Sequence, residues 1–251
     1  MRHIRRHCHW GVSVRSKICN LCTRMWPKPR THIPLLITGH PRCGTTSAGS
    51  ICRSMNLDVG DEGVGKHGAC SWMLAVDDRW SPYGSDRVGR DRRNLKWDWL
   101  LLVVRDLRAA VPSVILENRH ASRSFAFRRK HILKQLGIDI AESADEFTAA
   151  LRSILAWTRI ITNQSPDFLF RIEDQQAALR RFVVTKLGIV LSAERDVDIH
   201  DNTDKAYQGQ IWPKPEISEA DWQKVSREVN AEVEWYCRQF GYPNPTGGAR
   251  S

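Results

Sequence analysis

The stretch IPLLITGHPRCGTTSAGSICRS, residues 33–54, joins an apolar run, a tight glycine-containing loop and an amphipathic segment. The run IPLLIT has the length and composition of a buried strand, and Gly39 ends it. After the loop, apolar side chains recur at helical spacing, namely Ala48, Ile51, Cys52 and Met55. A strand that leads through a glycine-containing loop into a helix is the setting in which proteins bind phosphate groups.

The loop follows the pattern Gly39-x4-Gly44-Thr45-Thr46. The nucleotide-binding loop has the pattern G-x4-G-K-[ST], so Thr45 stands where that loop has its lysine. Glycines let backbone N–H groups approach an anion, and the amino end of the following helix adds positive charge. Arg42 supplies a cation from within the loop, and its planar guanidinium suits phosphate or sulfate oxygens. We therefore expect an anion site here, with a turn that binds no ligand as the alternative.

Apolar runs and helical patterns alternate along the rest of the chain. The runs WLLLVV (99–104) and DFLFRIED (167–174) are predicted strands. Periodicity and capping residues predict five more helices: one after Asp106 with Pro112 inside it or at its true start, one over 125–137, one opened by a capping box of Ser143 and Glu146, one closed by Gly188, and one from Ser218 to Gly241. Residues 192–216 are expected to be a polar loop. This alternation predicts an α/β three-layer sandwich around a short parallel sheet.

The positive charge of the chain is concentrated at its amino end. The formal net charge is +10, and residues 1–30 hold eight Lys or Arg and no acid, which leaves 30 basic against 28 acidic residues in 31–251. We expect residues 1–30 to be a basic, poorly ordered tail and residues 31–251 to be one domain. A body near neutrality argues against nucleic-acid binding as its main activity. Cys19 and Cys22, near His7–His9, leave zinc binding by the tail open, and no metal site is predicted in the body.

The chain has seven cysteines, an odd number scattered along its length. This pattern favours reduced thiols over a disulfide framework, and we therefore expect a cytoplasmic protein. No run approaches the roughly 18–20 apolar residues that a membrane span needs, so no membrane-spanning segment is predicted.

A second basic motif follows the predicted strand 99–104. Arg105 stands at its carboxyl end, and Ser113 comes eight residues later. Ligands of parallel sheets gather where the strands end, so Arg105 and Ser113 are expected to face the same crevice as Arg42.

Together these stretches resemble the sulfotransferases that use 3′-phosphoadenosine-5′-phosphosulfate (PAPS) as donor. The family's donor loop reads P-[KR]-[ST]-G-T-T, and this chain has PRCGTT at 41–46. The family's second motif is R-D-P-R with a serine eight residues after the first arginine, and this chain has RDLR at 105–108 followed by Ser113. FRIEDQQAALRRFVVTKLGI (170–189) and the ending WPKPEIS…CRQFGYP are similar to later family segments, so the resemblance spans roughly residues 33–243.

The resemblance implies a P-loop-like strand–loop–helix that holds the phosphosulfate, while Arg105 and Ser113 hold the 3′-phosphate. The donor-binding residues that it implies are Arg42, Cys43, Gly44, Thr45, Thr46, Ser47, Arg105, Ser113 and Lys205. It also implies that no metal is needed. Cys43 departs from the family's Ser or Thr, Ser47 from the aromatic residue of cytosolic members, and Leu107 from proline.

The activity implied is sulfuryl transfer from PAPS to an acceptor hydroxyl, expected on a carbohydrate or glycolipid. Arg42 would stabilise the leaving phosphate, and the general base is expected in GDEGVGKHGACSW (60–72). Glu62 fits the position of the base in some carbohydrate sulfotransferases, His67 is its rival, and Asp61 is the third candidate.

Two other classes of function remain open. A nucleotide kinase or hydrolase would use Asp106, after an apolar strand, to hold Mg²⁺, although the missing loop lysine argues against it. A non-catalytic binding module would use the basic tail to contact nucleic acid or zinc, with the body as a scaffold.

Overall fold

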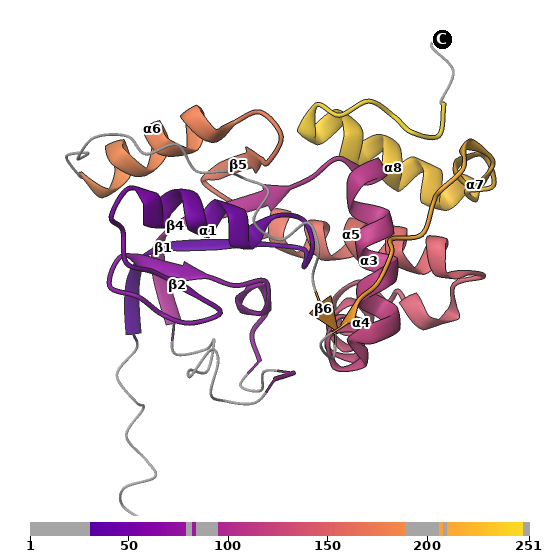
Figure 1. Ribbon diagram of the computed structural model, residues 1–251, viewed down its shortest axis with the longest axis horizontal. Coiled ribbons are helices and arrows are strands. Elements are labelled where there is room, and N and C mark those ends of the chain that lie inside the picture. Colours follow the sequence, from indigo (N-terminus) through magenta and orange to yellow (C-terminus); the bar gives the residue numbers. More distant parts are fainter. Residues whose placement is uncertain (1–30, 79–81, 84–94, 189–205, 208–209, 248–251) are drawn as a thin grey trace, which may run out of the picture.

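The computed structural model describes residues 31–78, 82–83, 95–188, 206–207 and 210–247 (Figure 1). The strands are β1 (Thr31–Gly39), β2 (Val59–Asp61), β3 (Gly68–Cys70), β4 (Leu95–Val104), β5 (Phe168–Arg171), β6 (Ala206–Tyr207) and β7 (Gln210–Ile211). The helices are α1 (Thr45–Ser54), α3 (Leu107–His120), α4 (Ser122–Leu136), α5 (Glu146–Thr162), α6 (Gln176–Leu187), α7 (Glu219–Gln223) and α8 (Arg227–Phe240), with short 3-10 turns η2 (Met73–Ala75) and η4 (Ile140–Glu142). The predicted tail and Lys205 lie outside the described residues.

The first five strands form one sheet in the order β2-β3-β1-β4-β5, and every neighbouring pair is parallel. The two longest strands, β1 and β4, lie side by side at its centre, with Gly39 opposite Val103. Strands β6 and β7 form a separate antiparallel pair within the segment predicted to be a polar loop. The expected α/β architecture with a parallel sheet is therefore confirmed.

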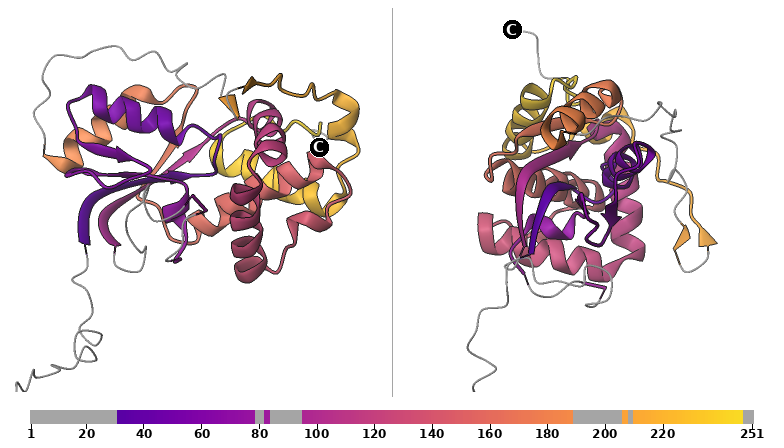
Figure 2. Two further views of the ribbon diagram at one scale, coloured as in Figure 1. Left: turned by 60° about the horizontal axis from the view of Figure 1, so that its bottom comes forward. Right: turned by 90° about the vertical axis from the view of Figure 1, so that its left-hand side faces the viewer.

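Helices cover both faces of this sheet (Figure 2). Alternate side chains of β4 point to opposite sides: Leu101 and Val103 join the core with α1 and α6, whereas Leu100 and Leu102 join the core with α3, α5 and α8. A central strand of a parallel sheet is buried on both faces, which explains why β4 appears in the sequence as a continuous apolar run. None of the helices in the described ranges is long and apolar enough to cross a membrane.

Two helix starts differ from the prediction. Helix α5 is capped by Asp145, whose carboxylate accepts a hydrogen bond from the Thr148 N–H, so the capping box of Ser143 and Glu146 is wrong. The chain makes the η4 turn before Ser143, and it enters helical geometry only after Asp145. Helix α3 begins at Leu107 with Asp106 as its cap, so Pro112 lies inside the helix and does not start it.

The predicted final helix is divided into α7 and α8. The helix predicted to begin at Ser218 does begin there, and Ser218 and Asp221 form a capping box for α7. Ser226 then caps a new helix by accepting a hydrogen bond from the Val229 N–H. Trp222 on α7 and Val229 on α8 are both buried. The segment from Ser218 to Gly241 is therefore helical as predicted, but a capping serine divides it into two helices that both pack on the core.

Candidate functional site: the carboxyl edge of the sheet

The chain changes direction across the sheet between β1 and β4. After β1 it passes through α1 to β2 and β3 on one side, and it then returns to β4 on the other side. In open α/β sheets, the crevice at such a reversal is where ligands bind. The loop that follows β1, residues 40–44, and the segment that begins α3 therefore border the most favourable binding position of this fold.

The structure brings Arg42 and Arg105 together at this crevice. The Arg105 guanidinium donates a hydrogen bond from Nη1 to the Arg42 carbonyl oxygen at 3.2 Å. Tyr236 on α8 holds the backbone of Arg105, because its hydroxyl donates to the Arg105 carbonyl at 2.8 Å. Arg42 and Arg105 therefore lie next to each other beyond the ends of β1 and β4, which places two positively charged residues at this edge of the sheet.

The backbone of the 40–44 loop is unusual at two positions. Arg42 has φ 71° and Gly44 has φ 96°, both in the left-handed region. Alternation of left-handed with ordinary residues turns successive N–H groups toward one concave side, a geometry that binds anions. Gly44 is also the N-cap of α1 and has no side chain with which to cap it, and the first turn of α1 contains no acid. The loop and the helix end therefore present N–H donors and a positive dipole together.

The two loop glycines are required by close packing. A Cβ atom on Gly44 would lie 2.2 Å from Cδ1 of Ile172, which follows β5, and a Cβ on Gly39 would lie 2.5 Å from the Val103 carbonyl oxygen. Both spacings are shorter than van der Waals contact. The glycine pattern of the loop thus reflects packing against β4 and β5 as well as backbone conformation.

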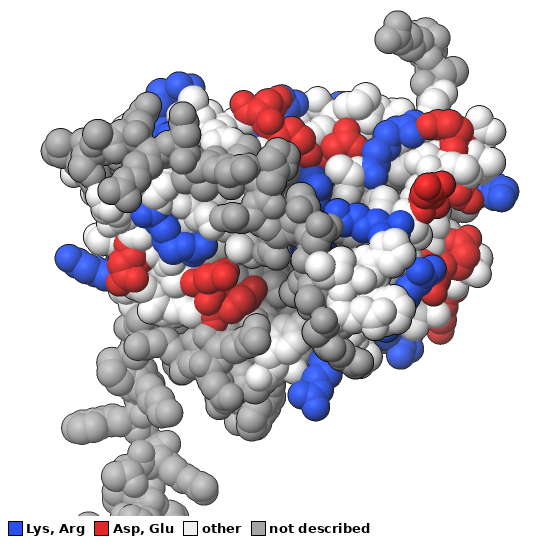
Figure 3. All heavy atoms as spheres, in the orientation of Figure 1, with Lys and Arg blue, Asp and Glu red and all other residues white. Residues whose placement is uncertain are grey.

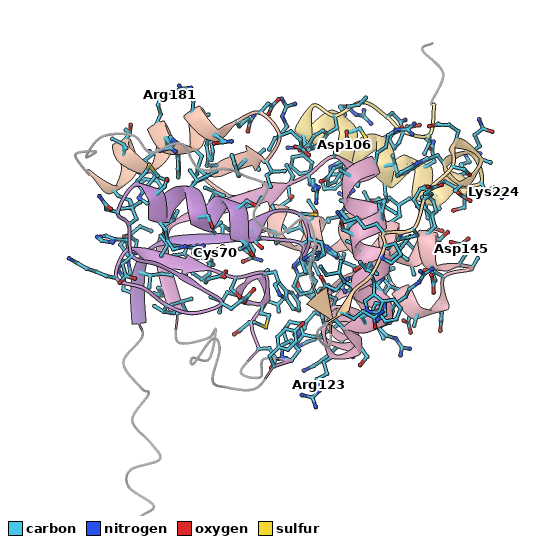
Figure 4. All side chains as sticks on the ribbon, viewed as in Figure 1. Cys70, Asp106, Arg123, Asp145, Arg181 and Lys224 are labelled. Atoms are coloured by element: carbon cyan, nitrogen blue, oxygen red, sulfur yellow. The ribbon has the colours of Figure 1, made fainter. Side chains whose placement is uncertain are left out.

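Among the remaining loop and α1 residues, Cys43, Thr45 and Ser47 are buried, whereas Thr46 is half-buried. Burial raises the pKa of the Cys43 thiol to about 12, so this thiol stays protonated at neutral pH. The Cys70 thiol donates a hydrogen bond to the Thr45 carbonyl oxygen at 2.8 Å, and Figure 4 labels Cys70 beneath α1. This hydrogen bond connects the first turn of α1 to β3.

Asp106 is occupied by structural contacts. Its carboxylate caps α3 by accepting a hydrogen bond from the Arg108 N–H at 2.7 Å, and Figure 4 shows it at the start of that helix. The Asp106 N–H donates to Glu173, whose second oxygen accepts from Tyr242. Arg108 forms an ion pair with Glu219. The RDLR motif therefore contributes only Arg105 to the crevice, and its other charged groups organise α3.

Ser113 lies on the second turn of α3 and is 1% exposed. Its hydroxyl oxygen is buried and has no hydrogen-bond partner within the described part of the chain. Buried hydroxyl groups are normally paired, so this one is available to a ligand that reaches α3. Its assignment to the donor's 3′-phosphate stays a prediction.

Glu62 lies at the carboxyl end of β2, on the same edge of the sheet as the loop. Its N–H donates to the Cys70 carbonyl at 2.8 Å, and it has φ 50°, again a left-handed conformation. Its carboxylate accepts a hydrogen bond of 2.5 Å from the Ser71 hydroxyl, which in turn accepts from the Met73 N–H. Ser71 is fully buried whereas Glu62 is half-buried, so a fixed partner orients a carboxylate that remains accessible.

The other two base candidates differ from Glu62 in position or in contacts. His67 precedes β3, and its Nδ1 accepts a hydrogen bond from the Asp58 N–H at the amino end of β2. His67 lies four positions before Ser71, and four positions span about 13 Å along an extended strand. Asp61 is the exposed last residue of β2. Of the three candidates, the structure brings Glu62 to the loop edge with a partner that orients it.

Sequence reasoning missed a buried polar cluster behind the loop. The cluster consists of His40, which follows β1, Arg128 on α4 and Ser153 on α5. All three side chains are fully buried and hydrogen-bonded to one another. The segment 125–137 is rich in basic residues, and an arginine of such a helix ordinarily faces solvent. Contacts that join residues 88 and 113 positions apart leave no local signal.

On the face that Figure 3 shows, Lys and Arg side chains are interspersed with Asp and Glu side chains. A cavity of about 230 Å³ lies between α4, α5 and α8, with apolar walls that include Leu136 and Leu155. Ion pairs Arg152–Glu228 and Arg159–Glu232 lie at this cavity, which shares no residue with the crevice. In the part of the chain that the structure describes, no group of three or more His, Cys, Asp or Glu is arranged to hold a metal ion.

Comparison of the chain with protein-family models, with curated proteins and with solved structures finds no match. Function is therefore inferred from the residues of the crevice themselves.

Proposed function

We propose that the chain is a sulfotransferase that moves a sulfuryl group from PAPS to an acceptor hydroxyl. The observation that carries the proposal is the 40–44 loop, in which left-handed Arg42 and Gly44 precede the uncapped end of α1 and Arg105 binds the loop backbone. This combination of N–H donors and two guanidinium groups suits a ligand with several phosphate-like charges.

Different residues of the crevice would bind the two charged ends of the donor. The loop N–H groups, Thr45, Thr46 and Arg42 would hold the 5′-phosphosulfate, and Arg105 would hold the 3′-phosphate together with Ser113. The unpaired buried Ser113 hydroxyl supports this division, because a phosphate oxygen would satisfy it. When bound, the donor supplies an activated sulfuryl group whose leaving partner is a phosphate.

Glu62 would act on the acceptor. Its carboxylate takes the proton from the acceptor hydroxyl while the acceptor oxygen forms its bond to sulfur and the bond from sulfur to the bridging phosphate oxygen breaks. The products are a sulfate ester and 3′-phosphoadenosine-5′-phosphate. Arg42 and the loop N–H groups stabilise the charge that develops on that bridging oxygen. Ser71 keeps the Glu62 carboxylate in one orientation. A carbohydrate or glycolipid hydroxyl is the proposed acceptor class, following the resemblance at Glu62.

The kinase alternative receives less support from the same residues. Thr45 stands at the lysine position of a nucleotide loop, and Asp106, the residue proposed to hold Mg²⁺, caps α3.

The four described cysteines, Cys43, Cys52, Cys70 and Cys237, are free and buried, which supports a cytoplasmic location for the proposed enzyme.

Calorimetric titration with 3′-phosphoadenosine-5′-phosphate, without metal, tests the donor site against a parallel titration with ATP and Mg²⁺. We expect the bisphosphate to bind and the nucleotide to bind at least tenfold more weakly. Binding of Mg-ATP alone would overturn the proposal in favour of a kinase or hydrolase. Binding of neither would remove the support for an enzyme.

The variant Glu62→Gln tests the base. It keeps the hydrogen bond with Ser71 but cannot accept a proton, so we expect donor affinity to stay unchanged and turnover, measured by release of the bisphosphate, to fall by about 10²–10⁴. His67→Gln is the matched control. The opposite result, with turnover lost in His67→Gln and kept in Glu62→Gln, would reverse the assignment.

A further inference from the structure

The buried cluster behind the loop connects the loop to three helices. Arg128 Nη1 donates to the Ser153 hydroxyl oxygen at 2.6 Å and to His40 Nε2 at 3.1 Å, and Nη2 donates to Asn118 Oδ1 at 2.8 Å. Glu117 lies 3.8 Å from the same guanidinium group. The partners of one buried arginine on α4 thus come from α3, α5 and the loop.

The hydrogen bonds assign the tautomer of His40. Its Nδ1 lies 2.6 Å from the Pro41 carbonyl oxygen, which only accepts, so Nδ1 carries the proton. Burial, and secondarily the nearby Arg128 charge, lower the pKa of His40 well below its usual range, so the ring is neutral. Nε2 is then an acceptor and faces the Arg128 and Ser153 donors. The ring joins a loop carbonyl on one side to a fixed cation on the other.

The Pro41 carbonyl belongs to the peptide that precedes Arg42, the loop residue with φ 71°. A left-handed non-glycine residue is costly and persists only where its surroundings enforce it. Buried ionic groups are weak evidence for stability, since apolar residues of similar size serve the core equally well, but they can specify a unique arrangement. Through its contact with His40, the buried Arg128 can specify the conformation of the loop backbone at Arg42.

We propose that Arg128 is a positioning residue of the 40–44 loop, acting through His40 and Ser153 to hold the backbone at Arg42 in its anion-binding shape. Only the effect on donor affinity rests on the proposed function, because the shape of the loop can be measured without any ligand. Cys43, in the same loop, is 1% exposed, and burial raises the pKa of its thiol, so it reacts slowly until the loop moves.

The test compares Arg128→Met with Arg129→Met, two adjacent positions on α4. The full chain is alkylated with iodoacetamide at pH 8, and fragmentation mass spectrometry assigns the modified cysteines. We expect Cys43 to react at least about tenfold faster in Arg128→Met, while Arg129→Met stays like the wild type. Cys237 on α8 is the internal control, because it is also buried but lies outside the 40–44 loop, so faster alkylation of Cys237 would report opening beyond the loop.

Milder variants keep the test decisive if Arg128→Met unfolds. Ser153→Ala removes one hydroxyl that contacts both His40 and Arg128. His40→Gln places an amide near the Nε2 position and keeps an acceptor for Arg128, whereas His40→Asn places its amide near Nδ1 and loses that acceptor. Each histidine variant therefore breaks one of the two contacts that link Arg128 to the Pro41 carbonyl, and we expect Cys43 to react faster than in the wild type in Ser153→Ala, His40→Gln and His40→Asn.

Two outcomes would overturn the proposal: Cys43 protected as in the wild type in a folded Arg128→Met or Ser153→Ala protein, or Cys43 protected as in the wild type in both His40→Gln and His40→Asn. Affinity for 3′-phosphoadenosine-5′-phosphate is measured alongside, and we expect about a tenfold loss in Ser153→Ala. If the wild type itself does not bind this ligand, the proposed function fails, while the alkylation rates still decide whether Arg128 positions the loop.

Discussion

Arg128 and Arg129 are neighbours on α4, but the guanidinium group of Arg128 is buried whereas that of Arg129 is exposed to solvent. Arg128 is fully buried and bonded to side chains of α5, α3 and the loop, whereas the side chain of Arg129 is 47% exposed and forms an ion pair with Asp139. The Arg129–Asp139 pair has the better ion-pair geometry, with two hydrogen bonds of 2.6 Å. Short distances alone therefore do not tell which charge matters.

Solvent explains the difference. An exposed pair exchanges water contacts for protein contacts at little net gain, but removing one partner of a buried pair leaves the other desolvated and unpaired. Buried residues of the crevice region differ in the same way from exposed residues on the outer surfaces of α4 and α7. The expected effects of substitutions therefore decrease from the buried positions to the exposed ones.

The largest effect is expected from Gly44→Ala compared with Gly137→Ala. Both glycines have positive φ, but a Cβ on Gly44 would lie 2.2 Å from Ile172, whereas Gly137 at the end of α4 has open space. We expect Gly137→Ala to cost about 1–2 kcal/mol and Gly44→Ala to cost about 2–5 kcal/mol in urea denaturation. Adding Ile172→Val, which removes the clashing Cδ1, should restore part of the loss. Equal losses at both glycines would contradict this account of the loop.

Arg42→Gly separates ligand binding from folding. Glycine adopts φ 71° without strain, so stability should stay within about 1 kcal/mol of the wild type. Loss of the guanidinium should weaken binding of 3′-phosphoadenosine-5′-phosphate by about 10–100-fold, as for other charged hydrogen bonds. Unchanged affinity, measured by calorimetry, would remove Arg42 from the donor site.

Stability should fall in acid through His40. Burial and Arg128 lower the pKa of folded His40 well below 6.5, so below pH 6.5 the unfolded chain takes up a proton that the folded chain refuses. Stability is therefore complete above pH 6.5 and decreases below it, by at most about 1.4 kcal/mol per pH unit. The urea midpoint at pH 7.5 and 5.5 should differ less in His40→Gln.

His131 provides the control for this pH effect. Burial also lowers the pKa of His131, although its hydrogen bond with Asp78 opposes the shift. His131→Asn should therefore keep most of the acid sensitivity. A His40→Gln protein with the full wild-type pH dependence would mean that His40 does not carry it.

The smallest effect is expected at Arg129, the exposed member of its ion pair. Arg129→Met should leave the thermal midpoint nearly unchanged at pH 7, because water replaces the contacts of a side chain that is 47% exposed, while Asp139 keeps its hydrogen bond from the Ala141 N–H. The hydrogen bond from Arg129 nevertheless lowers the pKa of Asp139 to about 2, which NMR titration of the wild type would detect. A large drop in the thermal midpoint would show that exposure is a poor guide to the importance of charges in this molecule.

Local patterns predicted the elements that border the crevice. The apolar run before Gly39 is β1, the run 99–104 lies within β4, and Gly188 and Gly241 end α6 and α8 with positive φ. Parallel strands end at one edge, so the meeting of Arg42 with Arg105 also followed from the sequence. Boundaries were less secure, since Asp145 capped α5 in place of Ser143 and Ser226 interrupted the last helix.

Other features required the register of the strands. His67 and Glu62 are five residues apart, and only the pairing of β2 with β3 shows that Glu62 lies at the edge near the loop while His67 lies on the amino-terminal side of β3. The partner of Glu62, Ser71, follows β3, and its hydroxyl has no local pattern to distinguish it from any other serine.

By itself, the sequence of this protein predicted β1, β4, β5, the 40–44 loop and most of the helices, because the spacing of apolar residues, glycines and caps acts over a few neighbouring residues. Only the tertiary structure decided that Arg128 is buried beneath that loop while Arg129 faces water. The reason is physical: a hydrogen bond between residues 88 positions apart depends on how α4 and α5 pack against the sheet, and that packing is a property of the whole chain.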